Sequence, residues 1–247
     1  MAKKPDAEMT FVEHLDELRT RLIISLAAVF VCSVGCYFLS LDALQLLMNR
    51  LDTGKLQYLG PADAFMVRLK ISVALGLAAA SPVVFWQVWL FVAPGLYRHE
   101  RRYAGPAVAA AVALFFTGAA FGVYTVPVTL NFLQKFGGGV LEANYTVDRF
   151  VSFAMSLIIA FAAVFELPLV LVLLVKIGVV SHARLAASRK YAFLLILIVS
   201  AVLTPADIVS MLIMAGPLYA LFEISLLVTR FVKTSDDSPG RDTARSR

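Results

Sequence analysis

Glu166 is a carboxylate in the middle of an otherwise apolar stretch, Phe150–Val175, and Pro168 follows it two residues later. An ionisable group inside a membrane span is costly and marks a functional position by default. Because proline has no N–H, Pro168 leaves a carbonyl of the preceding turn without its donor, close to the carboxyl. We therefore predict a polar concavity that faces water or a partner helix. The structural alternative is a protonated carboxyl that hydrogen-bonds to a neighbouring helix.

Two further acids, Glu17 and Glu100, lie among arginines near the ends of apolar runs. Glu17 belongs to TFVEHLDELRTRL, residues 10–22, where apolar side chains recur at the spacing of an amphipathic surface helix. Glu100 is the acid within RHERR, residues 98–102. Arginine favours bidentate carboxylate partners, so two such acids at one membrane surface would suit an arginine pair on a client peptide. The alternative is that both acids pair with arginines of their own segments.

The composition indicates that membrane helices position these residues. The chain is 60% hydrophobic and 16% charged, whereas a soluble domain carries about 25% charged residues. Helices rise about 1.5 Å per residue and the hydrocarbon core is about 30 Å thick. The first four apolar runs can therefore span, and the last two are expected to be short helices or a re-entrant hairpin. The runs are 22–41, 71–91, 104–126, 150–175, 191–203 and 208–228.

The basic residues between these runs predict the topology. Most Lys and Arg residues flank the same ends of the runs, together with both chain termini, so the positive-inside rule places both termini in the cytoplasm. The net charge of +5 then reflects topology and not nucleic-acid binding. We predict a cytoplasmic amphipathic segment at 1–21, a six-helix membrane domain at 22–229 and a disordered tail at 230–247.

Signatures of enzymes are missing from the sequence. It has no HExxH, G-x-S-x-G, P-loop or GxGxxG motif. Its histidines, His14, His99 and His182, lie outside the apolar runs without an acid cluster beside them. We expect no enzyme, no metal site and no cofactor. A proton-coupled small-molecule transporter that uses Glu166 is the competing function, and a structural scaffold for other membrane subunits is a third.

Several motifs together resemble the TatC family, the multispanning subunit of the twin-arginine protein translocase. The resemblance runs from about Thr10 to Thr229, and the number and order of the motifs make it specific. The motifs are HLDELRTR at 14–21, PADAF at 61–65, QVWLFVAPGLYRHERR at 87–102, FELP at 165–168 and RKYAFLLILIVSAVLTPADIVS at 189–210.

The resemblance implies an all-α polytopic fold of six transmembrane helices with a concave, glove-like face. It implies an intramembrane carboxylate, matched by Glu166, and a receptor for signal peptides that carry consecutive arginines. Positions tied to signal-peptide recognition match Glu17, Arg19, Phe91 and Glu100. The family's first external loop matches Pro61 and Phe65, and its tip between the fifth and sixth helices matches Pro205 and Asp207.

The resemblance also implies partners. They are single-span subunits of the TatA and TatB type, further copies of the chain itself, the lipid bilayer and folded client proteins with twin-arginine signal peptides. Transport would depend on the proton-motive force, and the location implied is a bacterial plasma membrane.

Overall fold

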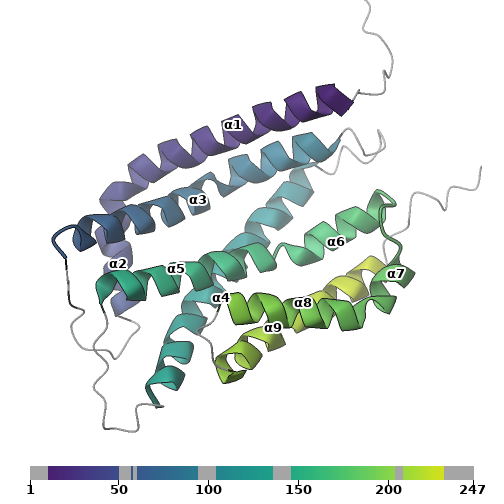
Figure 1. Ribbon diagram of the computed structural model, residues 1–247. Coiled ribbons are helices and arrows are strands. Elements are labelled where there is room, and N and C mark those ends of the chain that lie inside the picture. Colours follow the sequence, from purple (N-terminus) through teal and green to yellow (C-terminus); the bar gives the residue numbers. More distant parts are fainter. Residues whose placement is uncertain are drawn as a thin grey trace, which may run out of the picture.

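The structure is a computed structural model that describes residues 11–49, 57, 60–93, 104–135, 146–203 and 208–230. These ranges are helical apart from short turns and one isolated bridge between Gln57 and Thr146. Figure 1 shows the arrangement. The elements are α1 (Phe11–Cys36), η1 (Tyr37–Leu39), α2 (Ser40–Met48), α3 (Asp63–Val92), α4 (Ala104–Lys135), α5 (Val147–Val164), α6 (Leu167–Lys176), α7 (His182–Ala187), α8 (Arg189–Leu203) and α9 (Ile208–Arg230).

Four helical segments of the described chain are long and apolar enough to cross a bilayer: Val12–Met48, Asp63–Val92, Ala104–Gln134 and Val147–Lys176. They correspond to the first four predicted runs. Helix α8 has 15 residues and reaches only about 22 Å, as expected for a short fifth helix. Helix α9 has 23 residues and reaches about 34 Å. The expectation that the sixth helix is also short is therefore corrected.

Helices α1 and α3 run side by side in opposite directions (Figure 1). They approach closely at Gly76, where an added Cβ would lie 2.5 Å from the Cα of Ser33. Small residues let membrane helices approach in this way, since packing rather than the hydrophobic effect joins helices in lipid. The α1–α3 contact thus needs glycine at position 76, and it fixes α1 along the flank of the bundle.

A second close pair is formed by α4 and α5. A Cβ on Gly118 would lie 2.6 Å from the carbonyl oxygen of Phe161, and one on Gly122 would lie 2.7 Å from the Cα of Ile158. The two glycines are one helical turn apart, so they make a smooth stripe on α4. The buried rings and side chains of α5, such as Phe161 and Leu157, fill the core beside this stripe.

The predicted fourth run is divided into α5 and α6 at Phe165 and Glu166. The N–H of Glu166 donates to the carbonyl of Ala163 at 3.2 Å, as in a tighter turn. Pro168 has no N–H for the carbonyl of Val164, which is its partner in a regular helix. The two helices still form one apolar segment, Val147–Lys176, with a break at the carboxylate.

Helix α9 packs against α6 and α8. Glu223 of α9 accepts from the Nε and Nη2 of Arg189 at 3.0 and 3.2 Å, and from the hydroxyl of Tyr219 at 2.8 Å. Arg189 is the first residue of α8, so this ion pair joins the start of α8 to α9. The start of α1 and the end of α9 lie at the same end of the bundle (Figure 1).

Candidate functional site

The first candidate site lies where the start of α1 meets the end of α3. Arg21 donates from Nη2 to the Oε1 of Glu17 at 3.3 Å and from Nη1 to the Oε1 of Gln87 at 3.1 Å. The side chain of Glu17 is 18% exposed. Its second oxygen, Oε2, is buried without a hydrogen-bond partner among the described residues, and so is the Nε of Arg21. Glu17 therefore has one oxygen bonded to Arg21 and one buried oxygen without a donor.

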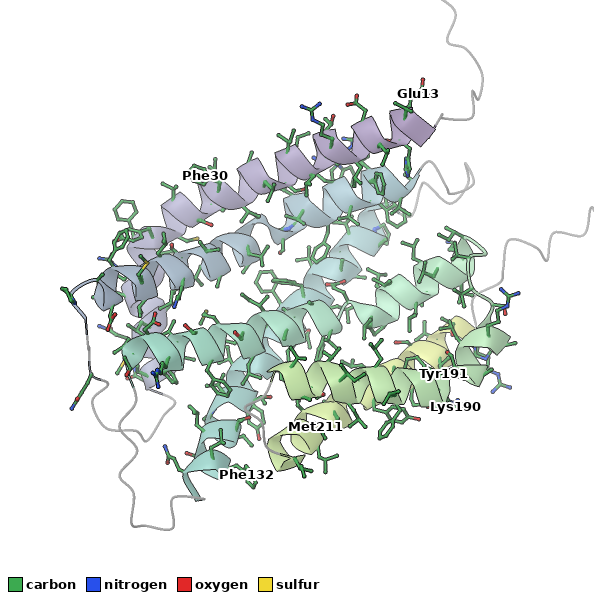
Figure 2. The ribbon with its side chains drawn as sticks, viewed as in Figure 1. Glu13, Phe30, Phe132, Lys190, Tyr191 and Met211 are labelled. Carbon is green, nitrogen blue, oxygen red and sulfur yellow. The ribbon has the colours of Figure 1, made fainter. Side chains whose placement is uncertain are left out.

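An aromatic contact closes this site on the side of the chain start. The ring of His14 stacks on Phe91 with centroids 4.4 Å apart and planes 12° from parallel. His14, Glu17 and Arg21 share one face of α1, since they follow helical spacing, and Gln87 and Phe91 are one turn apart on α3. We call these five residues the Glu17 cluster. Figure 2 labels Glu13 near the start of α1, which marks this end of the bundle.

The structure brings together some predicted recognition residues and not others. Glu17 and Phe91 belong to one cluster through His14 and Arg21. Arg19 is exposed on α1, roughly 200° around the helix from Glu17, and is not part of the cluster. Glu100 lies outside the described residues, as do Pro205 and Asp207 of the predicted tip.

Sequence reasoning missed three members of the Glu17 cluster as site residues: His14, Arg21 and Gln87. The i,i+4 spacing of Glu17 and Arg21 could have indicated their ion pair. Nothing in the sequence could have paired Arg21 with Gln87, since 66 positions separate them.

The second candidate site is the carboxyl of Glu166 at the break between α5 and α6. Its Oε1 is buried and has no hydrogen-bond partner among the described residues. It borders a cavity of about 140 Å³, here called the Glu166 hollow. The other walls are Phe85, Val88, Trp89 and Val92 of α3, Ala107, Val108 and Ala111 of α4, and Leu169, Val170 and Leu173 of α6.

The last turns of α3 contribute residues to both sites, from two different faces of the helix. Gln87 and Phe91 face α1, whereas Trp89 and Val92 face α4 and α6. The predicted hydrogen bond from Glu166 to a neighbouring helix is not made within the described chain. The sequence predicted a polar concavity at Glu166, whereas the walls of the hollow are apolar side chains apart from the carboxyl itself.

The predicted external-loop residues lie at the opposite end of the α1–α3 pair. Pro61 is exposed in the turn before α3, where the N–H of Gly60 donates to the Oδ2 of Asp63 at 2.8 Å. Phe65 is exposed on the first turn of α3. Neither residue contributes to the Glu17 cluster. In the described ranges no group of three or more His, Cys, Asp or Glu side chains is placed to hold a metal ion.

The four segments that are long and apolar enough to cross a bilayer indicate a polytopic membrane protein. The family model described as "Sec-independent protein translocase protein (TatC)" matches residues 13–217. The chain belongs to this family, and it is a component of the twin-arginine protein translocase.

Relatives and solved structures agree with this assignment. The TatC protein of Carboxydothermus hydrogenoformans is 38% identical over 240 residues, which cover 96% of this chain and 99% of the relative. The TatCd protein of Bacillus subtilis is 36% identical over 226 residues, which cover 91% of this chain and 93% of the relative. A crystal structure described as the twin arginine translocase receptor TatC superposes with a TM-score of 0.80 at 35% identity, covering 89% of this chain and 99% of the solved chain.

Proposed function

We propose that this chain is the receptor subunit that binds twin-arginine signal peptides and nucleates the assembly that exports folded proteins. The observation that carries the proposal is the buried, unpartnered Oε2 of Glu17, on a carboxylate whose other oxygen already binds a guanidinium. A buried carboxylate oxygen without a donor is unfavourable. A guanidinium from a client would remove that cost with a charge-assisted hydrogen bond.

The proposed recognition step uses the Glu17 cluster together with Glu100. One client arginine binds the Oε2 of Glu17, while Arg21 donates to Oε1 and is itself held in place by donating to the amide oxygen of Gln87. The stacked rings of His14 and Phe91 form an apolar floor beside it. Glu100 and Arg19 complete the site on the strength of the family resemblance, with Glu100 receiving the second client arginine.

The Glu166 hollow is proposed to act after recognition. A carboxyl bordered by apolar walls favours a partner that offers a hydrogen bond along with apolar surface. Such a partner is a single-span subunit of the TatA or TatB type, recruited together with further copies of this chain. Export driven by the proton-motive force follows from that assembly.

The proposed topology has six membrane helices with both termini in the cytoplasm of a bacterium, as the distribution of Lys and Arg predicts. The start of α1 and the end of α9 at one end of the bundle support the shared side (Figure 1). The Glu17 cluster then lies at the cytoplasmic surface, where a client's signal peptide first arrives.

The test is site-specific photocrosslinking in membrane vesicles to a precursor with an Arg-Arg signal, against a Lys-Lys control. Probes replace Val12 and Thr20, which are exposed on α1 near Glu17, and a control probe replaces Phe38 beyond the far end of α1. We expect crosslinks at the first two positions that fade with Lys-Lys, because lysine cannot bind a carboxylate through two donors of one planar group. Equal crosslinks with both signals would show a sensor of bulk positive charge. No crosslink with either would overturn the receptor assignment.

A second candidate function is proton-coupled transport of a small molecule through Glu166, favoured by its buried Oε1. Uptake of solute by the purified chain alone in liposomes, abolished in Glu166→Gln, would support it. Absence of uptake would exclude the transporter function and favour the receptor function.

A further inference from the structure

A long apolar groove runs along the outer flank of the α1–α3 pair, on a different face from both candidate sites. Its volume is about 680 Å³. Leu26, Phe30 and Val34 of α1 form one wall, and Leu69 and Val73 of α3 form the other. These side chains are exposed, and Figure 2 shows Phe30 on α1 on this flank. The groove is an apolar trough open to the surroundings of the bundle.

The length of the groove matches one leaflet of a bilayer. On α1 and η1 it extends from Leu26 to Phe38, which is about 18 Å at 1.5 Å per residue. Half of a hydrocarbon core about 30 Å thick is about 15 Å. A spanning helix of another protein would need the full thickness. An acyl chain needs only the half, so the dimensions fit a lipid tail better than a helix.

A preoriented cation stands at one end of the groove. The guanidinium of Arg68 lies 4.3 Å from the ring centre of Tyr37, which lines the groove. Its Nε donates to the Oγ of Ser40 at 3.2 Å and its Nη2 to the carbonyl of Tyr37 at 3.4 Å. Helical spacing places Arg68 beside Phe65 and Ser72, which also line the groove. These contacts therefore fix the side chain of Arg68 at this end of the groove.

The charge of Arg68 is not neutralised within the described part of the chain. Its contacts are a ring, a hydroxyl and a carbonyl, all of them uncharged. Lys70, two residues later, differs in this respect, because it pairs with Asp148 at 2.6 Å and with the hydroxyl of Ser152 at 2.8 Å. Nη1 of Arg68 makes no hydrogen bond to the described residues, so the group can bind an anion while keeping its present contacts.

We propose that the α1–α3 groove and Arg68 form a binding site for an anionic phospholipid. Arg68 donates to the phosphate, and one acyl chain lies along Phe30, Val34 and Val73 towards Leu26. Arginine suits phosphate because its planar group offers several parallel donors, and tyrosine commonly lies at the level of the headgroups. Basic pockets between membrane helices bind lipid headgroups at the cytoplasmic surface, and Arg68 offers the same chemistry at the opposite surface. The site is at the end of the bundle opposite the Glu17 cluster, so it is separate from client recognition.

The experiment is native mass spectrometry of the full chain in detergent, titrated with phosphatidylglycerol or with phosphatidylcholine of the same acyl chains. We expect the wild type to bind phosphatidylglycerol about fivefold more tightly, the contribution of one basic side chain near an anionic headgroup. Arg68→Gln should lose this preference, and Arg68→Lys should retain part of it. The matched control is Arg149→Gln, which removes an exposed cation at the same end of the bundle and should retain all of it.

Arg68 also donates to the backbone of η1, so replacing it could disturb the local fold. A second variant therefore keeps Arg68 and changes the groove instead. Val73→Trp fills the groove from an exposed position and should weaken phosphatidylglycerol binding several-fold. Glycerol phosphate, a headgroup without tails, should not compete at the same concentration. A wild type without preference, an Arg68→Gln variant that keeps the preference, or competition by glycerol phosphate would each overturn the proposal. So would a Val73→Trp variant that changes the oligomeric state while lipid binding is unaltered.

Discussion

The two carboxylates Glu17 and Glu166 lie in opposite kinds of surroundings, although each has one buried oxygen without a partner. Glu17 is surrounded by polar groups, with Arg21 at 3.3 Å and the amide of Gln87 behind it. Glu166 borders a hollow whose other walls are apolar. The Glu17 carboxylate already binds one cation, and its second oxygen is suited to bind another. A carboxyl among apolar side chains has no such neighbour, so it is suited to a partner that brings both a donor and apolar surface.

The largest effect is expected when the carboxylate in polar surroundings, Glu17, is removed. In Glu17→Ala, binding of an Arg-Arg signal peptide should weaken about tenfold to hundredfold, since hydrogen bonds between charged groups contribute about 1.5–3 kcal/mol. Peptide titration against the inserted protein measures it. Asp16→Ala is the matched control, because Asp16 is an exposed acid one position away on another face of α1. Equal losses in both variants would mean that the net charge of the segment matters and not the Glu17 cluster.

The next prediction concerns the close helix pairs that support the two carboxylates, α1–α3 for Glu17 and α4–α5 for Glu166. Gly76→Ala forces α1 away from α3, and Gly118→Ala forces α4 away from α5, because the new Cβ atoms would meet backbone atoms at 2.5 and 2.6 Å. Each should lower the free energy of unfolding by about 1–3 kcal/mol, measured by thermal unfolding in detergent. Gly76→Ala should also weaken peptide binding, whereas Gly118→Ala should not. Gly105→Ala, with nothing within 4 Å, is the control and should be unchanged.

A change at Glu166 should leave recognition intact. In Glu166→Leu, insertion and binding of the Arg-Arg peptide stay normal, while export of a folded reporter falls about tenfold, as expected for the loss of one polar contact between membrane helices. Glu166→Gln keeps a hydrogen-bonding group and should export better than the leucine variant. Normal export in Glu166→Leu would remove the functional role of the hollow. Loss of peptide binding in Glu166→Leu would show that Glu17 and Glu166 belong to one functional site.

The smallest effect concerns the ion pair within the Glu17 cluster. The side chains of this pair are only 29% and 18% exposed, but glutamine can keep a hydrogen bond to Glu17, so Arg21→Gln should lower the free energy of unfolding by about 1 kcal/mol. Peptide binding should change less than threefold, since Glu17 remains and glutamine can still hydrogen-bond to it. Arg184→Gln, an exposed arginine on α7, is the control. A loss as large as that of Glu17→Ala would show that Arg21 takes part in binding directly.

Much of the helical framework could be predicted from apolar runs, because their length is set by the bilayer and their ends by polar residues. The amphipathic segment lies in α1, Phe11–Cys36, which continues into the first apolar run without a break. Helix α9 covers the predicted sixth run, 208–228, and continues through Pro217 to Arg230. Proline within a membrane helix is tolerated when neighbours satisfy the freed backbone groups.

The candidate sites were predictable only in part. Glu17 and Glu166 could be identified as single residues, because a charge in or beside an apolar run is visible in the sequence. Their surroundings could not, because contacts such as Arg21 with Gln87 and Arg189 with Glu223 depend on which helices become neighbours. The identity of those neighbours is set by close contacts such as that of Gly76 with Ser33, which composition and spacing do not reveal.

The break between α5 and α6 also has a mechanical consequence. A continuous helix resists bending along its whole length because every turn is tied to the next by hydrogen bonds. At Glu166 that series of bonds is interrupted, and α6 is attached to α9, whereas α5 is attached to α4. The joint is therefore the most compliant point of the crossing. A load on α6 and α9 is taken up there as a change of angle, before it strains α4 and α5.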